Sequence, residues 1–166
     1  MITYFDIVKS PVGPLTCAMT DNALEGVYFE HEPDTLLELR KDWTKSTTKL
    51  SAVSGQLKEY FAGSRRKFDI PLHTRGTAFM ESVWAALRTI GYGETWSYGQ
   101  LAKQIGNASA SRAVGLANGR NPISIVVPCH RVIGANGTLT GFGGGIERKK
   151  WLLEFEARNV GKLLKF

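Results

Sequence analysis

The stretch SYGQLAKQIGNASASRAVGLANGRNP, residues 97–122, predicts two short helices joined by a turn. Ser97 can cap a first helix over YGQLAKQIG, because a serine hydroxyl accepts hydrogen bonds from the free amides at the start of a helix. Ser109 can cap a second helix over ASRAVGLANG in the same way. Together they predict a helix-turn-helix, a motif of many DNA-binding proteins that also occurs in other helical domains.

The second of these helices consists largely of small residues around one arginine, Arg112. The small residues are Ala108, Ala110, Ala113, Gly115, Ala117 and Gly119. Small side chains allow a helix to pack tightly on a neighbouring helix. They also allow it to approach a DNA duplex closely while one long cationic side chain enters the base stack. Both interpretations stay open, since they can apply to different faces of the helix.

Residues 73–166, which contain this helix pair, are predicted to form a mainly helical domain. In TAFMESVWAALRTI, apolar residues recur at helical spacing after Thr77, a residue suited to the N-cap position. The segment ERKKWLLEFEARN predicts another helix near the C-terminus.

Residues 1–72 are predicted to form a small α/β domain. Its first strand-like segments, separated by proline, glycine and turn residues, are ITYFDIV, LTCAMT and LEGVYFE. Two helical patterns follow, one from Asp34 and one over LSAVSGQLKEYFAG, and KFDIPL can return to the sheet. The fold class expected for the whole chain is therefore an α/β domain followed by a mainly α domain with a helix-turn-helix.

The net charge of +6 is unevenly distributed between the two parts. Residues 1–72 carry nine lysines and arginines against ten aspartates and glutamates, a net charge of −1. Residues 73–166 carry twelve against five, a net charge of +7. Such asymmetry indicates a polyanionic partner for the second part, and nucleic acid is the first candidate.

The chain has two cysteines, Cys17 and Cys129, and no apolar run long enough to cross a membrane. It begins without the basic and apolar segments of a signal peptide. Because the cytosol keeps thiols reduced, we expect a cytoplasmic protein with two free thiols. A chain of 166 residues can bury a sufficient core by itself. We therefore expect a monomer with no metal and no cofactor.

Cys129 lies in IVVPCHRVIG, residues 125–134, after a run of β-branched residues. The run favours a buried strand that ends at Pro128, so Cys129 is expected at the end of a strand. A lone cysteine is usually a small buried apolar residue, but the adjacent His130 also allows an activated nucleophile. Neighbouring residues of an extended chain point to opposite sides, so a water molecule could connect the thiol to the imidazole.

Two further side chains could support a reactive thiol. Glu156 lies on the inward side of the C-terminal helix and could orient His130 through its second ring nitrogen, although helical periodicity alone also allows a surface glutamate. Asn121 could satisfy a backbone group near Cys129, or it could be an ordinary turn asparagine.

Four segments, by their order and spacing, resemble the methylated-DNA–protein-cysteine alkyltransferases, which repair O6-alkylguanine in DNA. The segments are SYGQLA, SRAVGLANGRNP, IVVPCHRVIG and WLLEFE. The similarity covers most of residues 77–157, and PCHRV with the upstream RAVG is its most specific part. It implies that residues 1–72 form the family's smaller, RNase H-like α/β domain and that residues 73–166 form the DNA-binding and alkyl-acceptor domain.

The resemblance also implies roles for single residues in the transfer. Cys129 is the irreversible alkyl acceptor, and His130 with Glu156 is the relay that takes the thiol proton through water. Tyr98 assists base extrusion and donates to guanine N3, and Asn121 braces the active-site turn. The substrate expected from the family is duplex DNA containing O6-alkylguanine, with O4-alkylthymine as a further candidate.

The remaining implied roles concern DNA binding. Arg112 replaces the flipped base, and the small residues Ala113 and Gly115 let its helix approach the duplex. The segment TGFGGG, with Phe142, Gly143 and Gly144, corresponds to the loop over the extruded base. Phe142 stands where the family often has a tyrosine, so this loop lacks that hydroxyl.

Two other functions are compatible with parts of the pattern. A cysteine hydrolase could use Cys129, His130 and Glu156 for acyl transfer with turnover. A lesion-recognising DNA-binding protein would use the helix pair and Arg112 without transfer. The first leaves the helix-turn-helix unexplained, and the second leaves Cys129 unexplained.

Overall fold

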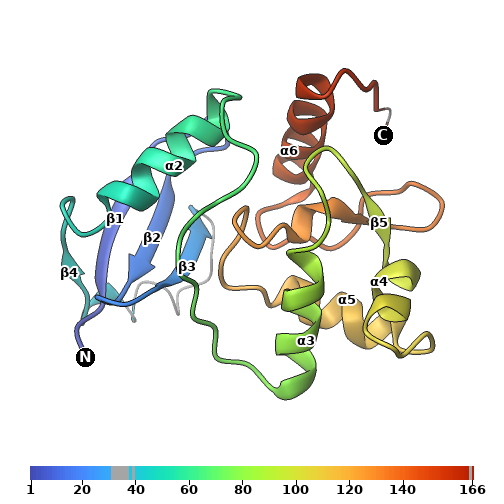
Figure 1. Cartoon of the computed structure of the whole chain (residues 1–166), viewed down its shortest axis with the longest axis horizontal. Helices are drawn as coiled ribbons and strands as arrows, with labels where there is room; N and C mark the ends of the chain where they lie inside the picture. The colour runs from blue at the N-terminus through green and yellow to red at the C-terminus, as the bar shows by residue number, and fades with distance from the viewer. Residues whose placement is uncertain (31–37, 39, 165) are drawn as a thin grey trace. The chain divides into compact units, whose positions relative to one another are not determined.

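The computed structural model describes residues 1–30, 38, 40–164 and 166, and it divides the chain into two compact units, Met1–Thr74 and Arg75–Phe166 (Figure 1). The sequence placed the boundary between residues 72 and 73. A sheet with a helix forms the first unit, and mainly helices form the second, which confirms the predicted fold class. In the described part of the chain, no helix has the length and apolar character that a membrane crossing requires.

The first unit is built on a four-stranded sheet in the order β3-β2-β1-β4. The strands are β1 (Tyr4–Val8), β2 (Leu15–Met19), β3 (Leu24–Phe29) and β4 (Thr44–Lys45). The first three form the predicted meander of antiparallel pairs. The parallel edge strand β4 was not predicted, because two residues are too few to show an alternating pattern. Leu72 bridges Leu24, so KFDIPL returns to the sheet as a single bridge.

Helix α2 (Ser51–Phe61) lies along the sheet of the first unit (Figure 1). It buries Val53, Leu57 and Tyr60, whose spacing of four and three residues places them on one face of the helix. The helix predicted from Asp34 begins outside the described residues.

Four helices form most of the second unit. They are α3 (Ala78–Leu87), α4 (Tyr98–Gln104), α5 (Ser111–Gly119) and α6 (Ile146–Asn159). Two predicted caps are confirmed, since Thr77 accepts a hydrogen bond from the Met80 amide and Ser97 forms a capping box with Gln100. The helix pair of the predicted helix-turn-helix is α4 and α5, which are in contact with each other and with α3.

The predicted Ser109 cap is wrong. The N-cap residue of α5 is Ala110, which has no side-chain cap, and Ser109 donates instead to Oδ1 of Asn107 at 3.1 Å. Because a short polar side chain can bond to its own turn, the serine here stabilises the loop rather than the helix.

The predicted strand before Pro128 is also wrong. The Val126 amide donates to the Ser124 carbonyl at 2.9 Å, closing a tight turn around Ile125, whose φ is +73°. A second tight turn around Pro128 is closed by the Cys129 amide, which donates to Val127. Ile125 and Val127 are buried and Val126 is half-buried, but burial alone does not distinguish a strand from compact turns. The short strand β6 (Val132–Ile133) comes only afterwards and pairs in parallel with β5 (Trp96–Ser97).

Candidate active site

Cys129 is the first residue of a 3₁₀ turn, Cys129–Arg131, and only 5% of its surface is exposed. Side chains from the end of α5 and from the loop after it hold the backbone around the thiol. Asn121 Nδ2 donates to the Val127 carbonyl at 2.8 Å, and Asn118 Nδ2 donates to the Cys129 carbonyl at 3.3 Å. The prediction that Asn121 satisfies a backbone group near the thiol is therefore confirmed, whereas Asn118 was not singled out from the sequence.

His130 and Glu156 are in direct contact, as predicted. His130 Nε2 lies 2.7 Å from Glu156 Oε2, and both side chains are buried. Burial alone would raise the pKa of the Glu156 carboxyl. The charges and hydrogen bonds of His130 and Arg131 outweigh burial and hold this pKa well below its usual range. Glu156 is therefore ionised at neutral pH.

His130 is neutral in this environment. Burial lowers its pKa below the ordinary value although Glu156 opposes the effect, and the charges of Arg131 and Lys149 lower it further. A carboxylate can only accept hydrogen bonds, so the proton of the neutral ring is assigned to Nε2. Nδ1 then carries a lone pair, and within the described residues this buried atom has no hydrogen-bond partner. The imidazole is thus prepared to accept a proton at Nδ1.

Arg131 is a site residue that the sequence analysis missed. Its Nε donates to Glu156 Oε1 at 2.8 Å, and its Nη1 donates to the Ile90 carbonyl at 2.7 Å. The Gly93 amide also donates to Glu156 Oε1, at 3.2 Å. Because a buried arginine requires a charged partner, its place directly between His130 and an apolar run was a usable signal.

Lys149 was also missed, although it is fully buried on α6. Its Nζ donates to the carbonyls of Val132 and Thr140 at 2.5 and 3.1 Å. Burial lowers the pKa of Lys149 to about 8, while the charge of Cys129 acts in the opposite direction. Helical periodicity could have revealed it, since Lys149 lies seven residues before Glu156 and so on the same face of the helix.

Tyr98 connects the helix pair to the loop that contains Phe142. Its hydroxyl donates to the Thr140 carbonyl at 3.2 Å, the same oxygen that Lys149 binds. A Cβ built at Gly115 would lie 3.6 Å from the Tyr98 ring, so this ring packs directly against α5. Phe142 is half-buried, with its ring centre 6.0 Å from Lys149 Nζ. In the same loop, Gly143 is exposed and Gly144 is buried.

Helix α5 has one buried face and one exposed face, so both interpretations of its small residues apply. Val114, Ala117 and Asn118 are buried, and the Ala117 carbonyl accepts a hydrogen bond from Trp84 Nε1 on α3 at 2.9 Å. Arg112 and Ala113 lie on the exposed face. The small residues therefore serve tight packing on one side and leave a low surface around Arg112 on the other.

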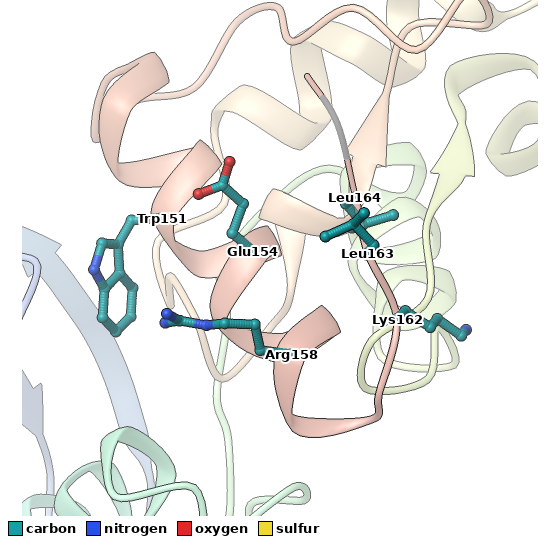
Figure 2. Close-up of a pocket in the computed structure, with 6 residues that line it drawn as sticks. All are labelled: Trp151, Glu154, Arg158, Lys162, Leu163 and Leu164. Carbon is teal, nitrogen blue, oxygen red and sulfur yellow. The ribbon is translucent and has the colours of Figure 1, made fainter.

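A separate pocket of about 340 Å³ lies on the other side of α6 and contains none of the predicted site residues (Figure 2). It is lined by Trp151, Glu154, Arg158, Lys162, Leu163 and Leu164. Glu154 and Glu156 thus occupy different faces of one helix, the first at this pocket and the second in the buried contact with His130. Among the described residues, no group of three or more histidines, cysteines, aspartates or glutamates could hold a metal ion.

A cysteine followed by a neutral histidine that an ionised glutamate orients is the arrangement of a thiol-dependent transferase or hydrolase. Comparisons with known proteins narrow this class. Residues 78–158 match the family described as 6-O-methylguanine DNA methyltransferase, DNA binding domain. Residues 3–74 match the ribonuclease-like domain of the same methyltransferases. The chain belongs to the 6-O-methylguanine DNA methyltransferase family.

Individual relatives agree with this assignment. The methylated-DNA–protein-cysteine methyltransferase of Mycobacterium bovis is 52% identical over 153 residues, which cover 92% of this chain and 92% of that protein. The crystal structure of Mycobacterium tuberculosis O6-methylguanine methyltransferase is 50% identical, with a TM-score of 0.89, and covers 95% of this chain and 94% of that one. A structure of Mycobacterium tuberculosis OGT in complex with DNA is 50% identical, with a TM-score of 0.88 and 94% of each chain covered.

Proposed function

We propose that this protein repairs O6-alkylguanine in duplex DNA by direct reversal, moving the alkyl group irreversibly to its own Cys129. Family membership supports the reaction class. The observation that carries the assignment to Cys129 is the 2.7 Å contact between His130 and Glu156, within the 3₁₀ turn that begins at this cysteine. The arrangement of these side chains alone would also suit a hydrolase, and family membership favours the transferase.

The first step is loss of the thiol proton. Glu156, ionised and bound to Nε2, fixes the tautomer of His130 and leaves the lone pair of Nδ1 for the proton of Cys129, carried through one water molecule. Lys149 stabilises the thiolate that forms, because its ammonium interacts electrostatically with Cys129. Asn121 holds the turn through the Val127 carbonyl, so the thiol keeps its position.

The second step is displacement at the alkyl carbon. The thiolate forms the sulfur–carbon bond while the bond from this carbon to guanine O6 breaks. The electron pair goes to the guanine, and one proton then restores the neutral base. Tyr98 assists by donating to guanine N3. The product is a thioether without an electrophilic carbonyl, so water does not release the alkyl group and each molecule reacts once.

Binding of the duplex is assigned to the exposed face of α5. The O6 atom of a paired guanine lies inside the duplex, so the nucleotide must be extruded at a cost of a few kcal/mol. Arg112 fills the vacated space, while Ala113 and Gly115 allow the helix to come close. Phe142, Gly143 and Gly144 lie over the extruded base. The net charge of +7 on residues 73–166 supports the same binding role.

The proposal places this chemistry in residues 73–166 and the protein in the cytoplasm, where the thiol stays reduced. The mass of the protein, measured after mixing with methylated duplex, distinguishes alkyl transfer from lesion recognition without transfer and from hydrolysis. Transfer adds one methyl group permanently, a hydrolase adds none at completion, and recognition alone adds none at any time.

Replacement of the acceptor gives the direct test. Cys129→Ala should lose methyl transfer completely and keep duplex binding. Cys17→Ala is the matched control, because Cys17 is fully buried in β2 and burial raises its pKa to about 12, which keeps it unreactive. Peptide mapping should locate the added mass on Cys129. Mass on Cys17, or continued transfer by Cys129→Ala, would refute the assignment.

A further inference from the structure

Leu116 interrupts the low exposed face of α5. Its side chain is 59% exposed, whereas its neighbours on that face include Ala113 and Gly119. The large apolar side chains exposed in the described part of the second unit are Leu116, Ile146, Leu163 and Phe166. Only Leu116 of these lies inside a helix, since Ile146 begins α6 and the other two belong to the C-terminal tail.

Leu116 lies between two arginines of the sequence and next to a glycine that faces an aromatic ring. Arg112 precedes it by four residues and Arg120 follows it by four, and both are exposed. At 1.5 Å per residue the two arginines are separated by about 12 Å along the helix, with Leu116 halfway between them. The adjacent residue, Gly115, faces the Tyr98 ring, which would lie 3.6 Å from a Cβ built at this glycine.

We propose that Leu116 is a DNA-contacting residue that packs against sugar and base edges beside the extruded nucleotide, while Arg120 binds a backbone phosphate. This inference rests on the proposed meeting of α5 with the duplex. The two cations suit a polyanion, and an apolar side chain between them excludes water from the groove surface, as apolar residues do in other proteins that deform DNA. Helix propensity does not explain a leucine at this exposed position, because alanine has the higher propensity.

The test compares L116A and R120A with L163A, which removes an equally large apolar side chain that is 84% exposed on the C-terminal tail. Binding of a fluorescent unmodified duplex is measured at several salt concentrations. L116A should weaken binding about tenfold, because an apolar contact that contributes about 1.4 kcal/mol to binding is lost. It should leave the slope of the logarithm of the binding constant against the logarithm of the salt concentration unchanged, because no charge is removed. R120A should reduce the slope by about 0.9. L163A should bind as the parent does.

Two results would overturn the role of Leu116. One is an affinity of L116A within a factor of two of the parent. The other is a lower melting temperature of L116A with a correspondingly weaker binding, which would make Leu116 a folding residue. Methylation of the parent on mixing with O6-methylguanine duplex is measured in parallel. Its absence would refute the proposed function, whereas normal methylation with unchanged L116A binding would refute only the contact.

Discussion

Replacement of Glu156 by glutamine tests the activation of the thiol most directly. The substitution keeps the size of the side chain and removes the charge that His130, Arg131 and the Gly93 amide share. Glutamate also raises the pKa of His130 against the effect of burial. Without it, the imidazole becomes a weaker base and loses the partner that fixes its tautomer.

The size of the effect follows from this contact. Loss of the adjacent carboxylate charge lowers the pKa of His130 further, and a rate that depends on this base should fall about ten- to hundredfold near pH 7. In alkali the thiol ionises without a base, so the rates of parent and mutant should converge. A buried arginine left beside a neutral amide also costs about 3–5 kcal/mol of folding stability.

The stability loss has its own dependence on pH. The folded-state pKa of Glu156 is lowered from the ordinary value of 4.5, so its contribution is present above that pH and is lost in acid. The parent should therefore lose stability as the pH falls below about 4.5, and Glu156→Gln should show a smaller further loss there. Urea titrations at neutral and acid pH measure both variants.

The assay is the pH profile of Cys129 alkylation by free O6-benzylguanine, which requires no duplex. Glu154→Gln is the matched control, since it changes the same residue type on the same helix at the pocket of Figure 2. It should keep the parent profile. Glu156→Asp retains the charge and should recover part of the rate. An unchanged profile for folded Glu156→Gln would remove Glu156 from the mechanism, even with Cys129 as the acceptor.

Two further substitutions probe the DNA side and the second buried cation. Arg112→Ala should slow repair of methylated duplex about tenfold or more and leave alkylation by the free base near the parent rate, because only the duplex requires extrusion; equal losses in the two assays would indicate a structural role. Burial lowers the pKa of Lys149 from 10.5 to about 8, so between pH 8 and pH 10.5 the unfolded chain binds more protons than the folded chain. The free energy of unfolding of the parent should therefore rise with pH in this range, by up to about 3 kcal/mol. Lys149→Met should abolish this rise in urea titrations, and it should slow alkylation near neutral pH; a retained rise would assign the titration to another group.

The sequence predicted those elements of the fold that depend on residues close together in the chain. The caps Thr77 and Ser97 and the three-stranded meander depend on neighbouring residues and were recognised in the sequence. The turns before Cys129 were not recognised, because a run of β-branched residues such as Ile125 and Val127 is typical of a buried strand as well as of buried turns. The turns are held by side-chain hydrogen bonds from Asn121 to the Val127 carbonyl and from Asn118 to the Cys129 carbonyl, and an apolar pattern gives no sign of such bonds.

The contact between the buried charged groups of Arg131 and Glu156 was not predicted from the sequence either, because it joins residues that lie far apart in the chain. Glu156 receives donors from Gly93 and from the turn at His130 and Arg131, between 25 and 63 residues away in sequence. Periodicity could place Glu156 on the inner face of α6, but only the tertiary fold shows that one carboxylate binds both the neutral imidazole of His130 and the guanidinium of Arg131. Burial is the main cause that lowers the pKa of His130 and keeps the ring neutral, and the charges of Arg131 and Lys149 add to burial against the opposing charge of Glu156. Without Arg131 the pKa of His130 would be higher and the ring closer to the imidazolium, which cannot accept the proton of Cys129. Arg131 therefore belongs to the chemistry of the thiol, although it has no place in the pattern from which the relay was first inferred.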